Sequence, residues 1–303
     1  MREIKGEAIT QAVARLCMSA NRNLPQDVRT CITQSQERES WEPARGILSK
    51  IVENYKIAEE DQLPICQDTG VACVFLEVGQ EVHIQGDLEQ AVNAGVHQGY
   101  LEAGLRCSVV ADPLRRVNTK DNTPAVLYIR LVPGDRLKIT VAPKGAGSEN
   151  MSRIAMLRPS DGAQGVKDFV FKTVAEAGPN PCPPIVVGVG IGGTFDRVAL
   201  LAKRALLRPL GSRHPDPYYD RSAELAKRAL LRPAGSPNPD PFYAEMEQEL
   251  LERINALGIG PQGLGGRTTA LAVHIEVAAV HMASLPVAVN INCHVTRHES
   301  EVL

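Results

Sequence analysis

The hydrophobic period changes several times along this 303-residue chain, and these changes limit the folds that it can adopt. The first sixty residues carry apolar side chains at helical spacing. Residues 71–86 and 125–143 instead alternate apolar and polar residues around glycine-containing turns, as half-buried strands and hairpins do. Helical spacing returns at 88–105 and 162–178, where glycines can end the helices. This order predicts an α+β or irregular α/β fold, with helices packed on mixed sheets.

The last third of the chain continues the mixed pattern. Residues 183–193, PPIVVGVGIGG, predict a buried strand that enters a glycine-rich turn. Residues 268–283, TTALAVHIEVAAVHMA, are expected to form a buried helix, and residues 287–295, VAVNINCHV, an inner strand. We expect residues 1–303 to form one large domain.

One segment is repeated in tandem. LAKRALLRPLGSRHPDPYY at 201–219 recurs as LAKRALLRPAGSPNPDPFY at 225–243. A solenoid needs three or more such units, and the sequence has no third copy. Each copy is a short basic helix stopped by proline and a Gly-Ser turn, so the pattern indicates a local duplication at 201–243 that lengthens a surface connection.

The charge balance argues against a nucleic-acid or membrane partner. Lys+Arg 33 against Asp+Glu 35 gives a formal net charge of -2, too balanced for a global basic field. No apolar run approaches the roughly 20 residues needed to cross a bilayer. The start, MREIKGEAITQAVARL, is typical of a charged amphipathic helix rather than a signal peptide. We therefore expect a soluble, cytoplasmic protein.

Seven cysteines are spread thinly along the chain, which is not typical of a disulfide framework. Most are expected to be small buried residues. Cys66, Cys182 and Cys293 differ, because they lie in LPICQDTG, between prolines in PNPCPP, and at a strand end in VNINCHVTRH. Such settings can hold a thiolate in place, but separations of 116 and 111 residues exclude a local zinc finger or ferredoxin run. Any shared site must form through the fold.

Three glycine-rich strings could bind an anion: KGAGSEN at 144–150, GVGIGGTFD at 188–196 and GIGPQGLGGRTTA at 258–270. Each offers backbone N–H groups that a carboxylate or phosphate can approach closely. None is a P-loop, and GVGIGG is a poor dinucleotide fingerprint. Any one of them alone is more typical of a tight turn.

Two pairs of side chains could act beside such a site. His274 and His281 would share one face of the expected helix, which leads into the strand carrying Cys293. A lone histidine on such a face is more often a hydrogen-bonded core residue. Arg106 and Arg267 could each bind a carboxylate in bidentate fashion.

Taken together, six motifs closely resemble the α subunit of two-subunit class I fumarate hydratases and the related L-tartrate dehydratase α subunits. The resemblance covers nearly the whole chain. The motifs are PICQDTG, KGAGSEN, CPPIVVGVGIGGTFD, LLRPLGSRHPDP, GIGPQGLGGRTTALAVH and AVNINCHVTRH.

The resemblance implies a [4Fe–4S] cluster held by three cysteine thiolates, which match Cys66, Cys182 and Cys293. The fourth iron would stay open and act as a Lewis acid on substrate oxygens, whereas an electron-transfer cluster is normally closed by four thiolates. The implied reaction is the interconversion of fumarate and (S)-malate.

The resemblance also implies residues that touch the substrate. Gln67, Arg106 and Gly147 match substrate-binding positions, with Arg106 on the far carboxylate and Gly147 offering its backbone N–H. Asp68 and His281 match residues that orient the substrate or transfer protons.

A second subunit is implied as well, because single-chain members carry a further domain and this sequence stops at Leu303. We expect a β subunit and an α2β2-like assembly. Three alternatives remain. An L-tartrate dehydratase α subunit is the first, although KGAGSEN resembles the fumarate hydratase version of that turn. A non-catalytic iron–sulfur sensor or electron-transfer protein would need a fourth thiolate, from Cys73 or Cys107. The third is an oligomeric scaffold with buried cysteines.

Overall fold

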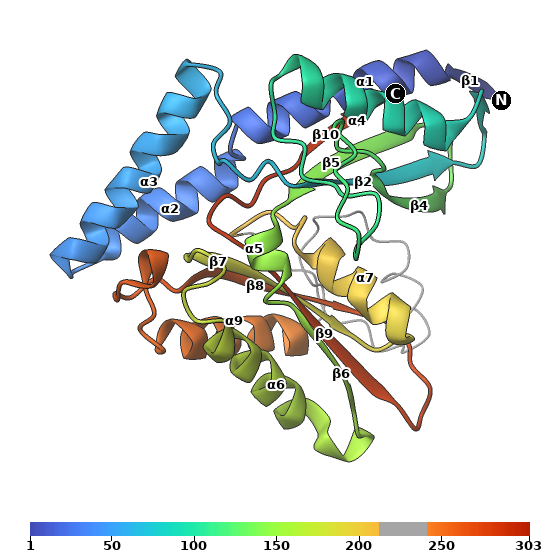
Figure 1. The fold of residues 1–303 in the computed structure, drawn as a ribbon. Coiled ribbons are helices and arrows are strands. Elements are labelled where there is room, and N and C mark those ends of the chain that lie inside the picture. Colours follow the sequence, from blue (N-terminus) through green and yellow to red (C-terminus); the bar gives the residue numbers. More distant parts are fainter. Residues whose placement is uncertain (212–240) are drawn as a thin grey trace. The chain divides into compact units, whose positions relative to one another are not determined.

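The computed structural model describes residues 1–211 and 241–303. They form two compact units: the first comprises Met1–Pro25, Glu53–Ala146 and Arg297–Leu303, and the second comprises Gln26–Val52 and the described part of Gly147–Thr296. Helices and mixed sheets occur in both, which confirms the expected α+β class (Figure 1). Among the described residues, no helix is long and apolar enough to span a bilayer.

The first unit packs two helices on a mixed sheet. The sheet has the order β10-β5-β2-β4, and a short parallel pair, β1 and β3, lies apart from it. The elements are α1 (Gly6–Arg22), α4 (Leu88–Glu102), β1 (Arg2–Lys5), β2 (Val71–Gly79), β3 (Val82–Gln85), β4 (Val126–Val132), β5 (Leu137–Lys144) and β10 (Glu299–Val302). The helix predicted from Met1 therefore begins only at Gly6.

The strand order of this sheet differs from a simple hairpin. β4 and β5 follow one another in the sequence, but both pair with β2, which runs parallel to β4 and antiparallel to β5. β2 is almost wholly buried whereas β4 alternates exposed and half-buried residues, so β2 takes the inner place and β4 the edge. The strands were predicted correctly, but the hairpins expected between consecutive strands do not form.

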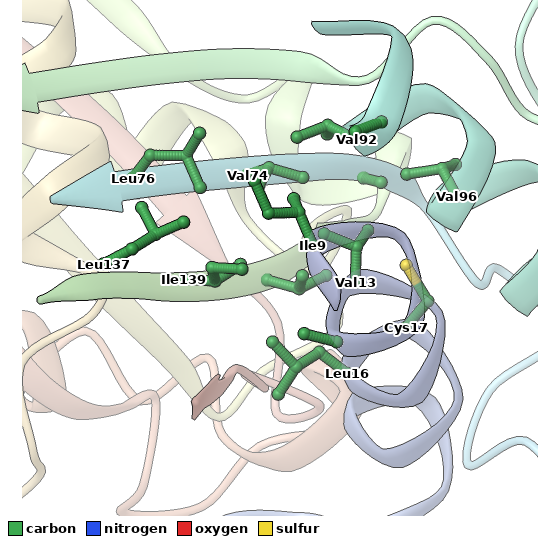
Figure 2. Close-up of a cluster of buried hydrophobic side chains, with 14 of the residues drawn as sticks. Ile9, Val13, Leu16, Cys17, Val74, Leu76, Val92, Val96, Leu137 and Ile139 are labelled. Atoms are coloured by element: carbon green, nitrogen blue, oxygen red, sulfur yellow. The ribbon is translucent and has the colours of Figure 1, made fainter. Parts of the chain in front are cut away.

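The core of this unit lies between α1, α4 and the sheet (Figure 2). Side chains at helical spacing on α1, such as Ile9 and Val13, meet Val74 of β2 and Ile139 of β5. The helices approach closely at Gly95, where a Cβ would lie 2.6 Å from a backbone oxygen of α1. Burying these side chains contributes about 1.5–3 kcal/mol each to stability.

The second unit is a four-stranded mixed sheet with helices on both faces (Figure 1). Its order is β6-β9-β7-β8, with β7 parallel to β8 and antiparallel to β9. The strands and helical turns are β6 (Arg153–Leu157), β7 (Ile185–Ile191), β8 (Ala270–Val277), β9 (Leu285–Asn292), η1 (Pro159–Asp161) and η2 (Pro261–Gly263). The helices are α2 (Gln26–Arg38), α6 (Gly162–Ala177), α7 (Phe195–Ala205) and α9 (Pro241–Asn255). Two further helices, α3 (Glu42–Glu60) and α5 (Ala146–Glu149), contribute residues to both units.

The alternation along β7 explains one glycine string. Val187 and Val189 face the side covered by α6 and α9. Gly188 and Gly190 face α7, where a Cβ would come within 2.2 Å of helix backbone oxygens. Gly188 and Gly190 therefore let α7 approach the sheet closely and do not form an anion-binding turn.

The helix expected at 268–283 is wrong. Ala270–Val277 forms β8, paired in parallel with β7, and residues 278–284 form a loop. Both faces of β8 carry buried residues, so its sequence lacks the regular alternation of a half-buried strand, and periodicity does not distinguish it from a buried helix. The helices predicted within the first sixty residues and at 88–105 and 162–178 are confirmed, as is the inner strand β9.

Most of the predicted duplication lies outside the described residues. Its first copy begins in α7 and its second ends in α9, but 212–240 fall in the gap. One domain spanning residues 1–303 stays a prediction.

Candidate functional site

The turn that carries Cys66, in the first unit, is built around Asp68. The Asp68 N–H donates to Cys66 Sγ at 3.4 Å. Its carboxylate accepts from the N–H of Gly70 at 3.0 Å and from that of Ala146 at 2.9 Å. Hydrogen bonds to sulfur stabilise a thiolate and tune iron–sulfur centres, so the local geometry suits Cys66 as a ligand.

Buried polar groups fix this turn beside Arg106. Thr69 Oγ1 donates to the Arg106 carbonyl at 2.9 Å. The Tyr100 hydroxyl lies within hydrogen-bonding distance of the carbonyls of Thr69 and Gly70, at 2.8 and 3.0 Å. Asn122, fully buried, donates to the Gly70 carbonyl at 3.0 Å. The predicted residues Cys66, Gln67, Asp68 and Arg106 are thus brought together, with the side chains of Gln67 and Arg106 exposed.

Gly147 directly follows Ala146 in the chain and belongs to the short helix α5 and to the second unit. It is exposed, and a Cβ there would meet only the Asn180 carbonyl, at 3.8 Å. Glu149 anchors the helix by accepting from Lys203 Nζ at 2.5 Å and from Asn290 Nδ2 at 2.7 Å. The backbone of Gly147 is therefore accessible and its helix is held in place.

Cys182 and Cys293 lie at one end of the sheet in the second unit. The start of β7 faces the end of β9, because Val186 pairs with Asn292. The His294 N–H donates to the Cys182 carbonyl at 3.3 Å, and the His294 ring nitrogen Nδ1 lies 3.1 Å from the same oxygen. Cys182 is exposed, and its φ of 56° lies in the left-handed region that non-glycine residues seldom adopt.

The glycine string at 258–266 braces this end of the sheet. Both the backbone N–H and Nε2 of Gln262 donate to the Pro183 carbonyl, each at 2.8 Å, and Nε2 lies 3.1 Å from His294 Nδ1. Gly263 packs against the turn before Cys182, since a Cβ there would lie 2.1 Å from Pro179 Cβ. These residues serve packing and bracing.

His281 lies elsewhere in the same unit. It is exposed in the loop that precedes β9, so the length of β9 separates it from Cys293, about 23 Å at 3.3 Å per residue. It lines a cavity of about 610 Å³ together with Phe195 and Arg197. His274 is a core residue, 5% exposed, with Nδ1 3.2 Å from the Ala205 carbonyl. The helix that would have put both histidines on one face does not exist.

The other singled-out residues play structural parts. Arg267 is exposed, and its backbone N–H donates to Glu39. Cys73 is buried within β2. Burial, together with the Asp121 carboxylate, raises the pKa of the Cys107 thiol, and burial raises the pKa of Cys17 to about 12. The raised pKa values make Cys17 and Cys107 poor sources of a thiolate ligand.

All seven cysteines lie among the described residues, and none forms a disulfide there. Within that part of the chain, no three His, Cys, Asp or Glu side chains are grouped to hold one metal ion. Cys66 belongs to one unit and Cys182 and Cys293 to the other. Their convergence on one cluster stays a prediction.

Comparison with known proteins identifies the family. The profile of the family described as "Fumarate hydratase (Fumerase)" matches residues 10–223 and, in a second segment, 218–302. The chain is 44% identical over 296 residues to a putative L(+)-tartrate dehydratase subunit alpha of Methanocaldococcus jannaschii, covering 95% of each chain. It is 33% identical over 289 residues to the L(+)-tartrate dehydratase subunit alpha of Escherichia coli strain K12, covering 94% of this chain and 87% of that one. The chain belongs to the fumarate hydratase (fumerase) family of hydro-lyases.

Proposed function

We propose that this chain is the cluster-binding α subunit of a [4Fe–4S] hydro-lyase that interconverts fumarate and (S)-malate. The observation that carries the proposal is the hydrogen bond from the Asp68 N–H to Cys66 Sγ, in a turn that also presents Gln67 and Arg106. Cys66, Cys182 and Cys293 would hold the cluster. When bound, it supplies an open iron position that acts as a Lewis acid on the hydroxyl and carboxylate oxygens of the substrate.

The chain's own residues would bind and orient the substrate. The exposed guanidinium of Arg106 suits bidentate binding of the far carboxylate. Gln67 and the backbone N–H of Gly147 would bind the remaining oxygens. Both Asp68 carboxylate oxygens accept backbone N–H groups, so this side chain is held in one orientation, as a group that positions a proton must be. Its place beside Cys66 supports a catalytic role.

A catalytic role for His281 stays a prediction. It lies at the opposite end of β9 from Cys293, and a four-carbon substrate is much shorter than that strand. Within the second unit, His281 and the two cysteines do not share a substrate-sized site. The expectation rests on the resemblance alone.

L(+)-tartrate is the second candidate substrate. Relatives at 33–44% identity are named L(+)-tartrate dehydratase subunit alpha, whereas the matching family is described by fumarate hydratase. Both substrates carry two carboxylates and react by loss or gain of water. The same residues of this chain would therefore serve either reaction.

The names of the relatives also support a partner, since each is an α subunit. We propose a β subunit, an α2β2-like assembly and a cytoplasmic location. The electron-transfer alternative needs a fourth thiolate, and the settings of Cys73 and Cys107 argue against both residues.

The test is anaerobic co-expression with the candidate β subunit, cluster reconstitution, and assay on fumarate, malate and L(+)-tartrate. We expect about four irons per α chain. We also expect turnover, either of fumarate and malate or of L(+)-tartrate. A colourless protein after reconstitution would favour the scaffold reading. A cluster without turnover of any of the three substrates would favour the sensor reading.

A further inference from the structure

Arg297 is a buried cation beside the Cys66 turn. It is 4% exposed, and its Nη2 donates to the Asp68 carbonyl at 2.7 Å. Its Nε is buried without a hydrogen-bond partner. Among the residues that the structure describes, the guanidinium forms no ion pair with a carboxylate. Burying a guanidinium without a paired carboxylate is costly, so the burial of Arg297 needs an explanation.

The neighbouring polar groups that the structure describes form no direct ion pair with the guanidinium of Arg297. The Asp68 carboxylate accepts from Gly70 and Ala146 instead. The Tyr100 hydroxyl is neutral, because burial, reinforced by Cys17, raises its pKa far above the ordinary value while the charge of Arg297 acts in the opposite direction. Arg297 therefore contacts the turn through a backbone carbonyl, without a direct ion pair to a carboxylate of the described residues.

The contact has a positional consequence. Residue 68 is held through its carbonyl by Arg297 and through its carboxylate by the backbone. Its N–H is thereby kept directed at Cys66 Sγ. In the chain, Arg297 also lies four residues after Cys293, within the same motif as that predicted ligand.

We propose that Arg297 is a positioning residue and the buried counter-charge of the Cys66 turn. It would fix the orientation of Asp68 and balance the negative charge brought there by the Cys66 thiolate and a bound dicarboxylate. The inference rests on the proposed function and deepens it by adding a residue that touches neither substrate nor cluster. A charge in a buried, low-dielectric setting acts far more strongly than one in water.

Two substitutions separate charge from hydrogen bonding in the reconstituted complex with its β subunit. Arg297→Gln removes the charge but keeps amide N–H donors, on a side chain that is two bonds shorter. Arg297→Lys keeps the charge but loses the planar fork. The control is Arg130→Gln, which removes a part-buried arginine from β4 of the same unit, where it pairs with Glu77 at 3.5 Å.

The readouts are the rate of iron loss to a chelator, followed by the cluster's visible absorbance, together with kcat, KM and the melting temperature. We expect R297Q to lose iron faster and turn over more slowly, by about 10–100-fold in each, the range usual for groups that support metal ligands. R297K should keep most of the iron retention and most of the turnover rate of the wild type. R130Q should keep both, and the melting temperatures of R130Q and R297Q should be similar.

Wild-type iron retention and turnover in a folded R297Q would overturn the inference. Equal losses of iron and turnover in R297Q and R297K would overturn the role as a counter-charge, because R297K keeps the positive charge and R297Q does not. If R297Q does not fold, R297K still decides, since iron loss from R297K as fast as from Cys66→Ser would overturn the inference. A wild-type complex that binds no iron would instead refute the proposed function.

Discussion

The backbone N–H of His294 donates to the carbonyl oxygen of Cys182 across 3.3 Å. The residue after Cys293 is thus bonded to the other predicted ligand of the same unit, although 111 residues separate the two cysteines. The antiparallel register of β7 and β9 produces this proximity. The pairing of these two strands therefore brings Cys182 and Cys293 to the same end of the sheet.

Gln262 should be needed to keep that arrangement. Gln262→Ala removes the bonds from Nε2 to the Pro183 carbonyl and toward His294, both part-buried. We expect a loss of about 0.5–1.5 kcal/mol in the free energy of unfolding, the usual net worth of one hydrogen bond, because the Pro183 carbonyl still accepts from the backbone N–H of residue 262. We also expect faster iron loss to a chelator. Gln248→Ala, at an exposed position on α9, is the control. Equal iron retention in the two variants would show that Gln262 has no bracing role.

Serine substitutions test the ligand set. Cys66→Ser, Cys182→Ser and Cys293→Ser should each abolish or strongly reduce the visible absorbance of the reconstituted cluster. Cys17→Ser should keep the absorbance, because burial raises the pKa of that thiol to about 12. Cys17→Ser should only lower the free energy of unfolding, by about 1–3 kcal/mol, because it buries a hydroxyl group. An unchanged spectrum in any of the first three would remove that residue from the ligand set.

Gly145 should control the orientation of Asp68. A Cβ at Gly145 would lie 3.1 Å from Asp68 Oδ2, so Gly145→Ala should push the carboxylate away from its place. We expect turnover to fall about 10-fold or more, as misplacement of a catalytic group does, with little change in melting temperature. Gly46→Ala, in α3 where a Cβ meets nothing within 4 Å, should keep turnover and gain stability. Equal turnover in both variants would contradict the assigned role of Asp68.

A buried ion pair should stabilise the second unit. Arg208 binds Glu247 through two nitrogens, at 2.5 and 3.2 Å, and Glu247 also accepts from the Ile275 N–H at 2.7 Å. Glu247→Gln leaves the buried guanidinium unpaired and should cost about 3–5 kcal/mol in denaturant unfolding. Adding Arg208→Met should recover much of that loss, because the double variant buries no charge and its glutamine can still accept from Ile275. A double variant as unstable as Glu247→Gln would refute this account.

The sequence singled out three candidate ligands, but it did not show the residues that surround them. Cys66, Cys182 and Cys293 stand out through prolines and strand ends, which are local signals. The strand at Ala270–Val277 was mistaken for a helix because a strand buried on both faces loses its alternation. The position of His281 was misjudged for the same reason.

Residues that support the Cys66 turn were missed altogether. Tyr100, Asn122 and Arg297 reach it from distant segments, and their roles depend on strand order. Of these three, only Arg297 could have been noticed in the sequence, because it lies in the same motif as Cys293. The order β10-β5-β2-β4 could not be read from periodicity, since either neighbour of β2 satisfies the same pattern.

The last prediction concerns the partner. The relatives are named as α subunits, and Asp68, the carboxylate beside Cys66, already has both oxygens bound by backbone N–H groups. A second acid or base is then needed to exchange the proton on the substrate carbon, and general catalysis of such a step is worth about 10²–10⁴-fold in rate. The purified α chain with an intact cluster should therefore turn over at least about 100-fold more slowly than the complex with the β subunit. Added β subunit should restore the rate in a saturable titration, whereas an unrelated protein at the same concentration should not. Full turnover by α chain shown by mass spectrometry to be free of β subunit would place the whole catalytic set within these 303 residues.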